Sequence, residues 1–204
     1  GKLKEYDELE RLLKRILEIS PDYAVAARNL AKNYIETNRF KDATELLEKI
    51  VEQQPTNLDA LGMLLAVDLR AGRTEIAEKR LEKSLEQNQN SADVFLLKAR
   101  FERSFRNYPA AVETLTKLNL RFGPNTEWKA LLGETLYAAG EYQQAITVLR
   151  EAVSENPSSV SHYLKLARAL DSAGQVDAAE DAVDEALEIA PGHPLSRLTK
   201  VKYL

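Results

Sequence analysis

The chain has 204 residues, with 44% hydrophobic residues, only 7% aromatic residues and a formal net charge of -4. This composition suits helices packed through Ala and Leu, and the acidic balance disfavours nucleic acid as the main partner. The sequence contains no cysteine, which excludes disulfides and thiolate metal sites. No apolar run approaches the ~18 residues of a membrane span, and no signal-peptide pattern opens the chain. We therefore expect no membrane insertion by this segment, and both the cytoplasm and a bacterial periplasm are compatible.

A period of 34 residues runs through the whole sequence without insertions. One row of residues at this spacing reads Leu9, Ala43, Ala77, Ala111, Ala145 and Ala179. A second row reads Leu13, Leu47, Leu81, Leu115, Leu149 and Val183, and a third reads Ala31, Leu65, Ala99, Gly133, Ala167 and Val201. A fixed period of this length predicts stacked units that each bury one face against a neighbour.

Each period contains the pattern of two helices joined by a short turn. In chain order we expect a helix within 2–19, then helix pairs at 23–37 and 40–53, 57–71 and 74–87, 91–105 and 108–121, 125–139 and 142–155, 160–173 and 176–189, and a last helix in 194–204. In the pair at 160–189, Leu166 and Leu170 share one helical face and Gly174 ends the first helix. Val176 and Val183 are expected to point inward from the second helix, which Pro191 stops.

The pattern resembles the tetratricopeptide repeat (TPR) family over the whole chain. Repeat 126–159 supplies the family's small, turn, aromatic and closing residues at Leu132, Gly133, Gly140, Tyr142, Ala145, Leu149 and Pro157. The resemblance implies an all-α, right-handed αα superhelix of about 12 antiparallel helices. It is specific for the fold and nearly silent on the ligand, because these residues form the packing code.

We expect one solenoid domain over 1–204, with five complete repeats and a half repeat at each end. Its parts are the half repeat 1–23, the repeats 24–57, 58–91, 92–125, 126–159 and 160–193, and the half repeat 194–204. Because both ends fall in mid-repeat, we interpret the chain as a piece of a longer array.

Two repeats depart from the family pattern. Asp68 and Glu102 stand where Tyr34 stands in the first full repeat, and Arg106 takes the place of the turn glycine. Lys98 replaces a Leu, and we expect its ammonium to reach solvent. We interpret these departures as sequence drift rather than function.

The family geometry places the first helix of each pair on the inner surface, which implies a partner-binding groove there. The rows that packing leaves free mix apolar and charged residues and fit a peptide with apolar anchors and acidic groups. The predicted groove residues are Arg28, Lys32, Leu96, Arg100, Arg103, Glu134, Tyr137, Leu164 and Arg168.

Two other ligands are weighed against a peptide of this kind. Some family members grip a terminal carboxylate with Lys and Asn, and Arg28, Asn29 and Lys32 repeat that set in part, but Met63 and Asp93 break it in the next repeats. The run 100–106 alternates Arg with Phe, as single-stranded nucleic acid sites do. On a helix its two Phe residues share a face, so packing is the favoured interpretation.

No residues suggest catalysis, a cofactor or a metal. His162 and His193 lie 31 residues apart and belong to no metal or general-base motif. There is no Gly-rich phosphate loop and no nucleophile elbow. The sequence therefore predicts a protein that is not an enzyme.

Two hypotheses of different class follow. The first is a protein-interaction scaffold that binds a partner peptide or helix in its groove. The alternative is a structural spacer or self-associating segment of a large assembly, such as a bacterial secretion or exopolysaccharide-export component, with end-to-end contacts between copies.

Overall fold

The computed structural model describes residues 2–21 and 23–203. The chain divides into two compact units, unit 1 (Gly1–Leu97) and unit 2 (Lys98–Leu204). Every regular element in the described ranges is helical: twelve α-helices and one short 3₁₀ helix. The expected all-α fold class is confirmed, while a single domain over the whole chain stays a prediction.

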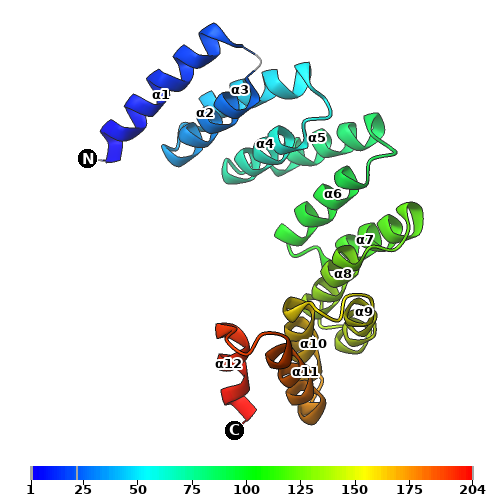
Figure 1. Ribbon diagram of the computed structural model, residues 1–204. Helices are drawn as coiled ribbons and strands as arrows, with labels where there is room; N and C mark the ends of the chain where they lie inside the picture. The colour runs from blue at the N-terminus through cyan, green and yellow to red at the C-terminus, as the bar shows by residue number, and fades with distance from the viewer. Residues whose placement is uncertain (1, 22, 204) are drawn as a thin grey trace. The chain divides into compact units, whose positions relative to one another are not determined.

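Unit 1 consists of antiparallel neighbours in chain order (Figure 1). Its helices are α1 (Lys2–Ile19), α2 (Ala24–Glu36), α3 (Phe40–Gln53), α4 (Leu58–Arg70) and α5 (Thr74–Gln87), followed by the start of α6 (Ala92–Ser104). Each of α1 to α4 packs against the helix that follows it, and α2 also touches α4, the first helix of the next pair.

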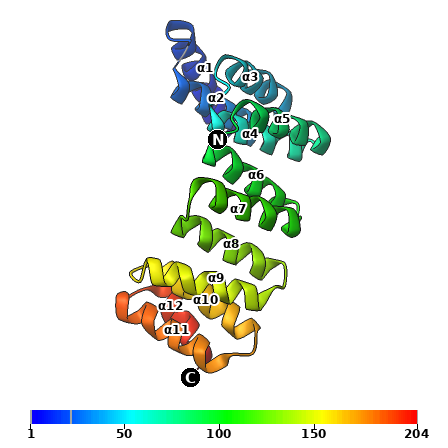
Figure 2. The same ribbon diagram turned by 90° about the vertical axis from the view of Figure 1, so that its right-hand side faces the viewer.

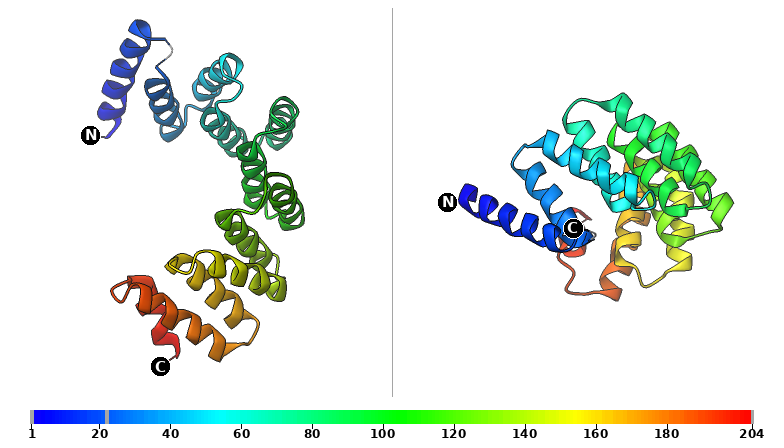
Figure 3. Two further views of the ribbon diagram at one scale, coloured as in Figure 1. Left: turned by 45° about the vertical axis from the view of Figure 1, so that its right-hand side comes forward. Right: turned by 90° about the horizontal axis from the view of Figure 1, so that it is seen from above.

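Unit 2 repeats this arrangement after the end of α6 (Figure 2). Its helices are α7 (Tyr108–Phe122), α8 (Thr126–Ala138), α9 (Tyr142–Glu155), α10 (Val160–Ser172), α11 (Val176–Ile189) and α12 (Pro194–Lys200), with a 3₁₀ turn, η1, at Val201–Tyr203. From α7 onward each helix packs on the next, and α8 also touches α10. The views of Figure 3 show α12 beside α11.

The turn inside each complete pair uses one repeat position with a left-handed backbone. Gly72, Gly140 and Gly174 have φ between 72° and 85° there, and Asn38 and Arg106 each have φ of 58° at the equivalent positions. Glycine adopts this conformation without a steric penalty, whereas Arg106 carries a Cβ into it. The turn geometry is therefore kept even where the sequence departs from glycine.

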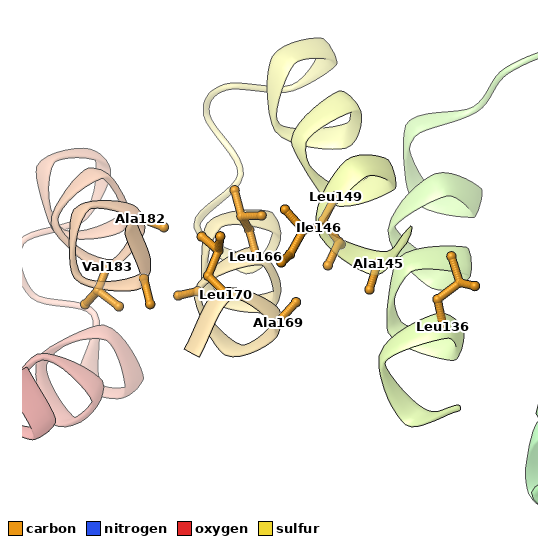
Figure 4. Close-up of a cluster of buried hydrophobic side chains, with 11 residues drawn as sticks. Leu136, Ala145, Ile146, Leu149, Leu166, Ala169, Leu170, Ala182 and Val183 are labelled. Atoms are coloured by element: carbon orange, nitrogen blue, oxygen red, sulfur yellow. The ribbon is translucent and has the colours of Figure 1, made fainter. Parts of the chain in front are cut away.

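Small residues let the paired helices approach closely. The five alanines of the first sequence row after Leu9 are all fully buried, and the leucine row is at most 5% exposed. In unit 2, Ala145 and Leu149 of α9 face Leu136 of α8 on one side and Leu166 of α10 on the other (Figure 4). A continuous helix-to-helix core of this kind is what a repeat array buries.

Gly133 lies where α8 and α9 approach each other closely. A Cβ built on Gly133 would lie 2.5 Å from Cγ of Leu149, which itself is fully buried. The third sequence row holds Ala or Leu in the other complete repeats, so the glycine here is matched to the leucine that crosses it.

Three residues predicted to point inward are exposed. Val176 begins α11 and is 50% exposed, because the first turn of that helix extends past the core made by Ala179 and Val183. Leu9 is 41% exposed, since α1 contacts α2 through Leu13 and its neighbours instead. Val201 is 64% exposed in the 3₁₀ turn.

Asp68 and Glu102, interpreted from the sequence as drift rather than function, make specific structural contacts within their repeats. Asp68 is completely buried, and its two carboxylate oxygens pair with Arg73 at 2.8 Å and Arg80 at 2.9 Å. In the next repeat, Thr114 Oγ1 donates a 2.8 Å hydrogen bond to Glu102. In both repeats a carboxylate in the tyrosine position ties the first helix to the second helix of its pair.

Lys98 does not simply extend into solvent. Its ammonium lies 3.4 Å from Glu102 on the same helix, and its side chain is 37% exposed. The carboxylate that replaces the tyrosine therefore also holds this lysine.

Candidate functional site

The nine predicted groove residues divide between the two units. Three belong to unit 1: Arg28 on α2, Lys32 on α2 and Leu96 on α6. Arg28 and Lys32 are exposed, and Arg28 lies 3.5 Å from Asp59 of α4, while Leu96 is half-buried. The exposed pair of opposite charges at Arg28 is worth little on its own.

The other six predicted residues lie in unit 2, where the structure contains a groove of about 520 Å³ between α8, α10 and α12. We call it the α10 groove. Three of the predicted residues, Glu134, Leu164 and Arg168, line it directly. The remaining lining residues are Ser161, Lys165, Asp171, His193, Leu195, Thr199, Lys202 and Tyr203.

Three cationic side chains surround the carboxylate of Glu134. Arg103 and Lys165 each place a nitrogen 3.9 Å from Oε2, and Arg168 places one 3.7 Å from Oε1. These separations exceed hydrogen-bond length, so the three cations are attracted to Glu134 but do not donate hydrogen bonds to it. Charged donors left in this state can bind an anionic group of a ligand.

The ring of Tyr137 contacts this cluster through Arg168. The guanidinium of Arg168 lies 4.5 Å from the centroid of the Tyr137 ring, and the centroids of the Tyr137 and Tyr142 rings are 5.6 Å apart. Ser172 Oγ donates a 3.3 Å hydrogen bond to the Tyr137 hydroxyl. Stacking on an aromatic ring orients an arginine and lowers the entropy that it loses on binding.

The third wall of the α10 groove comes from the last helix and the 3₁₀ turn. Lys202 is hydrogen-bonded to Asp171 of α10, and this bond raises the pKa of Lys202 above its ordinary value. Burial raises the pKa of the Tyr203 phenol. Leu195 adds an apolar surface that is 56% exposed, opposite the half-buried Leu164.

The α10 groove carries a surplus of positive charge. Arg103, Lys165, Arg168 and Lys202 stand against the carboxylates of Glu134 and Asp171. Arg103 approaches Glu134 from outside the lining, so the lining itself holds three cations and two anions, a formal charge of +1 in a chain whose net charge is -4. Acidic groups are therefore attracted to this surface even though the whole chain is acidic.

The sequence missed Lys165, Asp171, His193, Lys202 and Tyr203 as members of the site. Lys202 occupies the same repeat position as Arg168, 34 residues earlier, which is a signal that could have included it. Asp171 likewise occupies the repeat position of the predicted Arg103 and Tyr137. The positions of Lys165, His193 and Tyr203 depend on which side chains reach across between α10 and α12, and no periodic pattern encodes that reach.

The alternating Arg and Phe residues of 100–106 pack largely as expected. The rings of Phe101 and Phe105 lie 5.0 Å apart between centroids, and Phe101 is buried. Arg103 turns to Glu134, and Arg100 is exposed on α6. The two rings are engaged with each other, as the packing interpretation requires.

The two histidines have structural surroundings. His162 of α10 is 1% exposed, and its Nε2 lies 3.4 Å from Glu127 of α8. His193 caps α12 by accepting a hydrogen bond from the backbone N–H of Ser196.

Within the described residues no group of three His, Asp or Glu side chains is arranged to hold a metal ion. In the same ranges, no helix has the length and apolar character to cross a membrane.

Comparison with models of known protein families assigns the chain to a family. Two tetratricopeptide repeat models match it, one over residues 67–124 and 131–194 and the other over residues 2–67. The chain therefore belongs to the tetratricopeptide repeat family, whose members generally act as non-enzymatic scaffolds that bind protein or peptide partners. No curated protein matches the sequence.

Several solved structures share the fold at low sequence identity. YrrB, described as a TPR protein with an unusual peptide-binding site, is 18% identical, with coverage of 92% of this chain and 97% of YrrB and a TM-score of 0.60. The 41-end form of MamA from Desulfovibrio magneticus RS-1 is 15% identical, with coverage of 85% and 98% and a TM-score of 0.63. A chain of the APC/C hetero-tetramer Cut9-Hcn1 is 18% identical, with coverage of 96% and 39% and a TM-score of 0.59.

Proposed function

We propose that this chain is a non-enzymatic scaffold that binds an extended or helical segment of a partner protein in the α10 groove. The observation that carries the proposal is the groove itself, which joins an apolar strip to a net positive cluster. The unusual peptide-binding site of YrrB, a protein with a similar fold, agrees with this class of function.

The groove suits a segment with an apolar anchor and at least one acidic side chain. The anchor packs between Leu164 and Leu195, which face the groove from α10 and α12. The acidic group meets Arg168, whose side chain is 51% exposed and whose guanidinium is already stacked on Tyr137. Tyr and Arg are among the residues that most often dominate interface energy.

Of the other predicted groove residues in unit 2, Glu134 lines the groove and Arg103 lies beside it on α6, while Arg100, which is exposed on α6, remains a predicted contact. Arg28, Lys32 and Leu96 of unit 1 remain predicted contacts for a longer partner segment. The proposal requires no cofactor and no metal.

A peptide-display selection against the full chain tests the proposal. We expect enriched peptides to combine Asp or Glu with a large apolar residue, and their capture to fall as salt rises, because the exposed charges are screened. The matched comparison uses Arg168→Ala against Arg150→Ala, an exposed arginine of α9 outside the groove. A selection that yields the same peptides with both variants would overturn the assignment of the groove.

The alternative function, a self-associating or spacer segment, has its own supporting observation. Leu12 of α1 is 58% exposed, and on α12 Leu195 and Leu198 are 56% and 70% exposed. Large apolar side chains that gather on a helix surface favour contact with another molecule. A second copy is the occupant that this alternative predicts.

Sedimentation of the full chain over a range of concentrations separates the two functions. Association that Leu198→Glu and Leu12→Glu each abolish, with no effect of Arg168→Ala, supports self-association. A chain that stays monomeric at high concentration leaves the scaffold as the function and refutes end-to-end contact.

A further inference from the structure

An exposed face of α1 combines apolar and acidic side chains. Leu13 of this helix packs into the core of unit 1 and is only 5% exposed, whereas its neighbour Leu12 is 58% exposed. Helical spacings of three, four and seven residues place four other exposed side chains on the side of Leu12. We call this set the α1 face, and its members are Glu5, Glu8, Leu9, Leu12 and Ile19. Three apolar side chains and two carboxylates are therefore accessible to another molecule.

The α1 face has a negative charge. Within the described part of the chain, neither of its two carboxylates forms an ion pair with another side chain. Arg15 borders the face and lies 3.9 Å from a glutamate of the same helix. The cations Lys4 and Arg11 are about a quarter turn around the helix axis from the centre of the face. The face is therefore attracted to the positive α10 groove.

The α1 face and the α10 groove carry matching groups at the same spacing. Leu164 and Arg168 are four residues apart on α10, which separates the apolar surface from the guanidinium by about 6 Å along the helix axis. Glu8 and Leu12 have the same separation on α1. If the two helices run antiparallel, Leu12 meets Leu164 while Glu8 meets Arg168. Leu195 of α12, which is 56% exposed, then covers the other side of Leu12.

We propose that the α1 face of a second copy of this chain binds in the α10 groove. This inference rests on the proposed function and names the partner segment, an amphipathic helix with both the apolar and the acidic groups that the groove requires. The contact is heterologous, because it joins α1 of one copy to α10 and α12 of another, and it can repeat from copy to copy. It differs from the end-to-end contact of the alternative function, because Leu198 does not line the groove and takes no part.

Exchange of the two opposite charges tests the contact in sedimentation runs of the full chain over a range of concentrations. Glu8→Arg and Arg168→Glu should each weaken association at least about tenfold, because each sets two like charges against one another. The double variant restores an opposite pair and should recover part of the loss. Asp7→Arg is the matched control, since Asp7 is an exposed acid of α1 outside the face, and it should associate like the wild type. Leu198→Glu should also leave association unchanged.

Capture of display-selected acidic peptides separates this inference from the proposed function. Glu8→Arg leaves the groove intact and should capture these peptides like the wild type, and an excess of peptide should dissociate the assembly. A chain that captures peptides but stays monomeric at high concentration would overturn the inference and leave the proposed function standing. A double variant no stronger than the single variants, or association that Leu198→Glu abolishes, would also overturn it. A chain that neither associates nor captures peptides would overturn both.

Discussion

Replacing Gly133 by Ala should destabilise unit 2, although alanine is the better helix former. Gly133 lies inside α8, where the exchange alone is worth about 0.8–1.0 kcal/mol in favour of alanine. The new methyl group would meet Leu149 at 2.5 Å from Cγ and 2.8 Å from Cδ2. Real Cβ contacts do not occur at such distances, so α8 and α9 must separate or Leu149 must leave its rotamer.

The steric cost exceeds the helical gain. Overpacking a close core contact costs about 1–3 kcal/mol, so we expect a net loss near 1 kcal/mol for Gly133→Ala. Gly62→Ala is the matched control, because Gly62 also lies inside a helix, α4, and its nearest neighbour would be Leu97 Cδ1 at an ordinary 3.6 Å. That variant should gain up to about 1 kcal/mol, which puts the two variants about 2 kcal/mol apart.

Urea unfolding followed by helical circular dichroism gives the midpoints, and hydrogen exchange of the α8 and α9 amides reports the loss locally. The local measurement matters because repeat arrays do not always unfold in one cooperative step. If Gly133→Ala is stabilised as much as Gly62→Ala, the close helix crossing at Leu149 is not a constraint and the packing argument fails.

Three other changes have definite expected outcomes. Arg106→Gly removes a side chain from a left-handed turn and should raise the free energy of unfolding by about 1 kcal/mol. A free energy of unfolding below that of the wild type would refute backbone strain at Arg106. Asp68→Asn leaves its two arginine partners without their buried counter-charge and should cost about 3 kcal/mol, whereas an unchanged midpoint would refute a structural role for the pair. Burial works against ionisation of Glu10, but hydrogen bonds from Lys14 and Arg39 outweigh it and hold the pKa of Glu10 below its ordinary value. Because the folded pKa is the lower one, this stabilisation is present above the unfolded pKa and is lost as the pH falls through the folded pKa. The wild type should therefore lose more stability than Glu10→Gln between about pH 6 and about pH 3. Equal losses in the two proteins would contradict this contribution of Glu10.

Helix positions could be predicted closely because the repeat period fixes them. The ranges 40–53, 74–87, 142–155 and 176–189 coincide with α3, α5, α9 and α11. The first helices of the pairs were predicted one residue too long at both ends where the range included the capping residues. Asn57, for example, accepts a hydrogen bond from the backbone N–H of Ala60 and so stands before α4 rather than in it.

The sequence was less informative about polar residues inside the repeats. Asp68 looked like drift because periodicity only records that a tyrosine position holds a carboxylate. The structural role of Asp68 depends on Arg73 and Arg80, which lie 5 and 12 residues further along the chain. Both pair with the Asp68 carboxylate, Arg73 from the following turn and Arg80 from the following helix. Two arginines after an acidic residue in a packing position are a signal that could have identified the buried ion network.

Repeat position accounts for part of the lining of the candidate groove, namely three of the nine predicted residues. Glu134, Leu164 and Arg168 follow from the rows that packing leaves free, and the structure brings them to one groove. The cluster of cations around Glu134 was not predictable, because Arg103 and Lys165 reach it through long side chains from α6 and α10. Side-chain reach of this kind depends on the distance between helices, which a one-dimensional pattern does not contain.

Calorimetric titration of one display-selected acidic peptide into the wild type, Arg168→Ala and Arg150→Ala tests the central claim most directly. Arg168 lies in the α10 groove on the Tyr137 ring, and Arg150 is an exposed arginine of the same unit outside it. Loss of a groove arginine that meets an acidic group should weaken binding at least about tenfold, equivalent to about 1.4 kcal/mol, with wild-type affinity for Arg150→Ala. Equal affinity for all three proteins would contradict the assignment of partner binding to this groove.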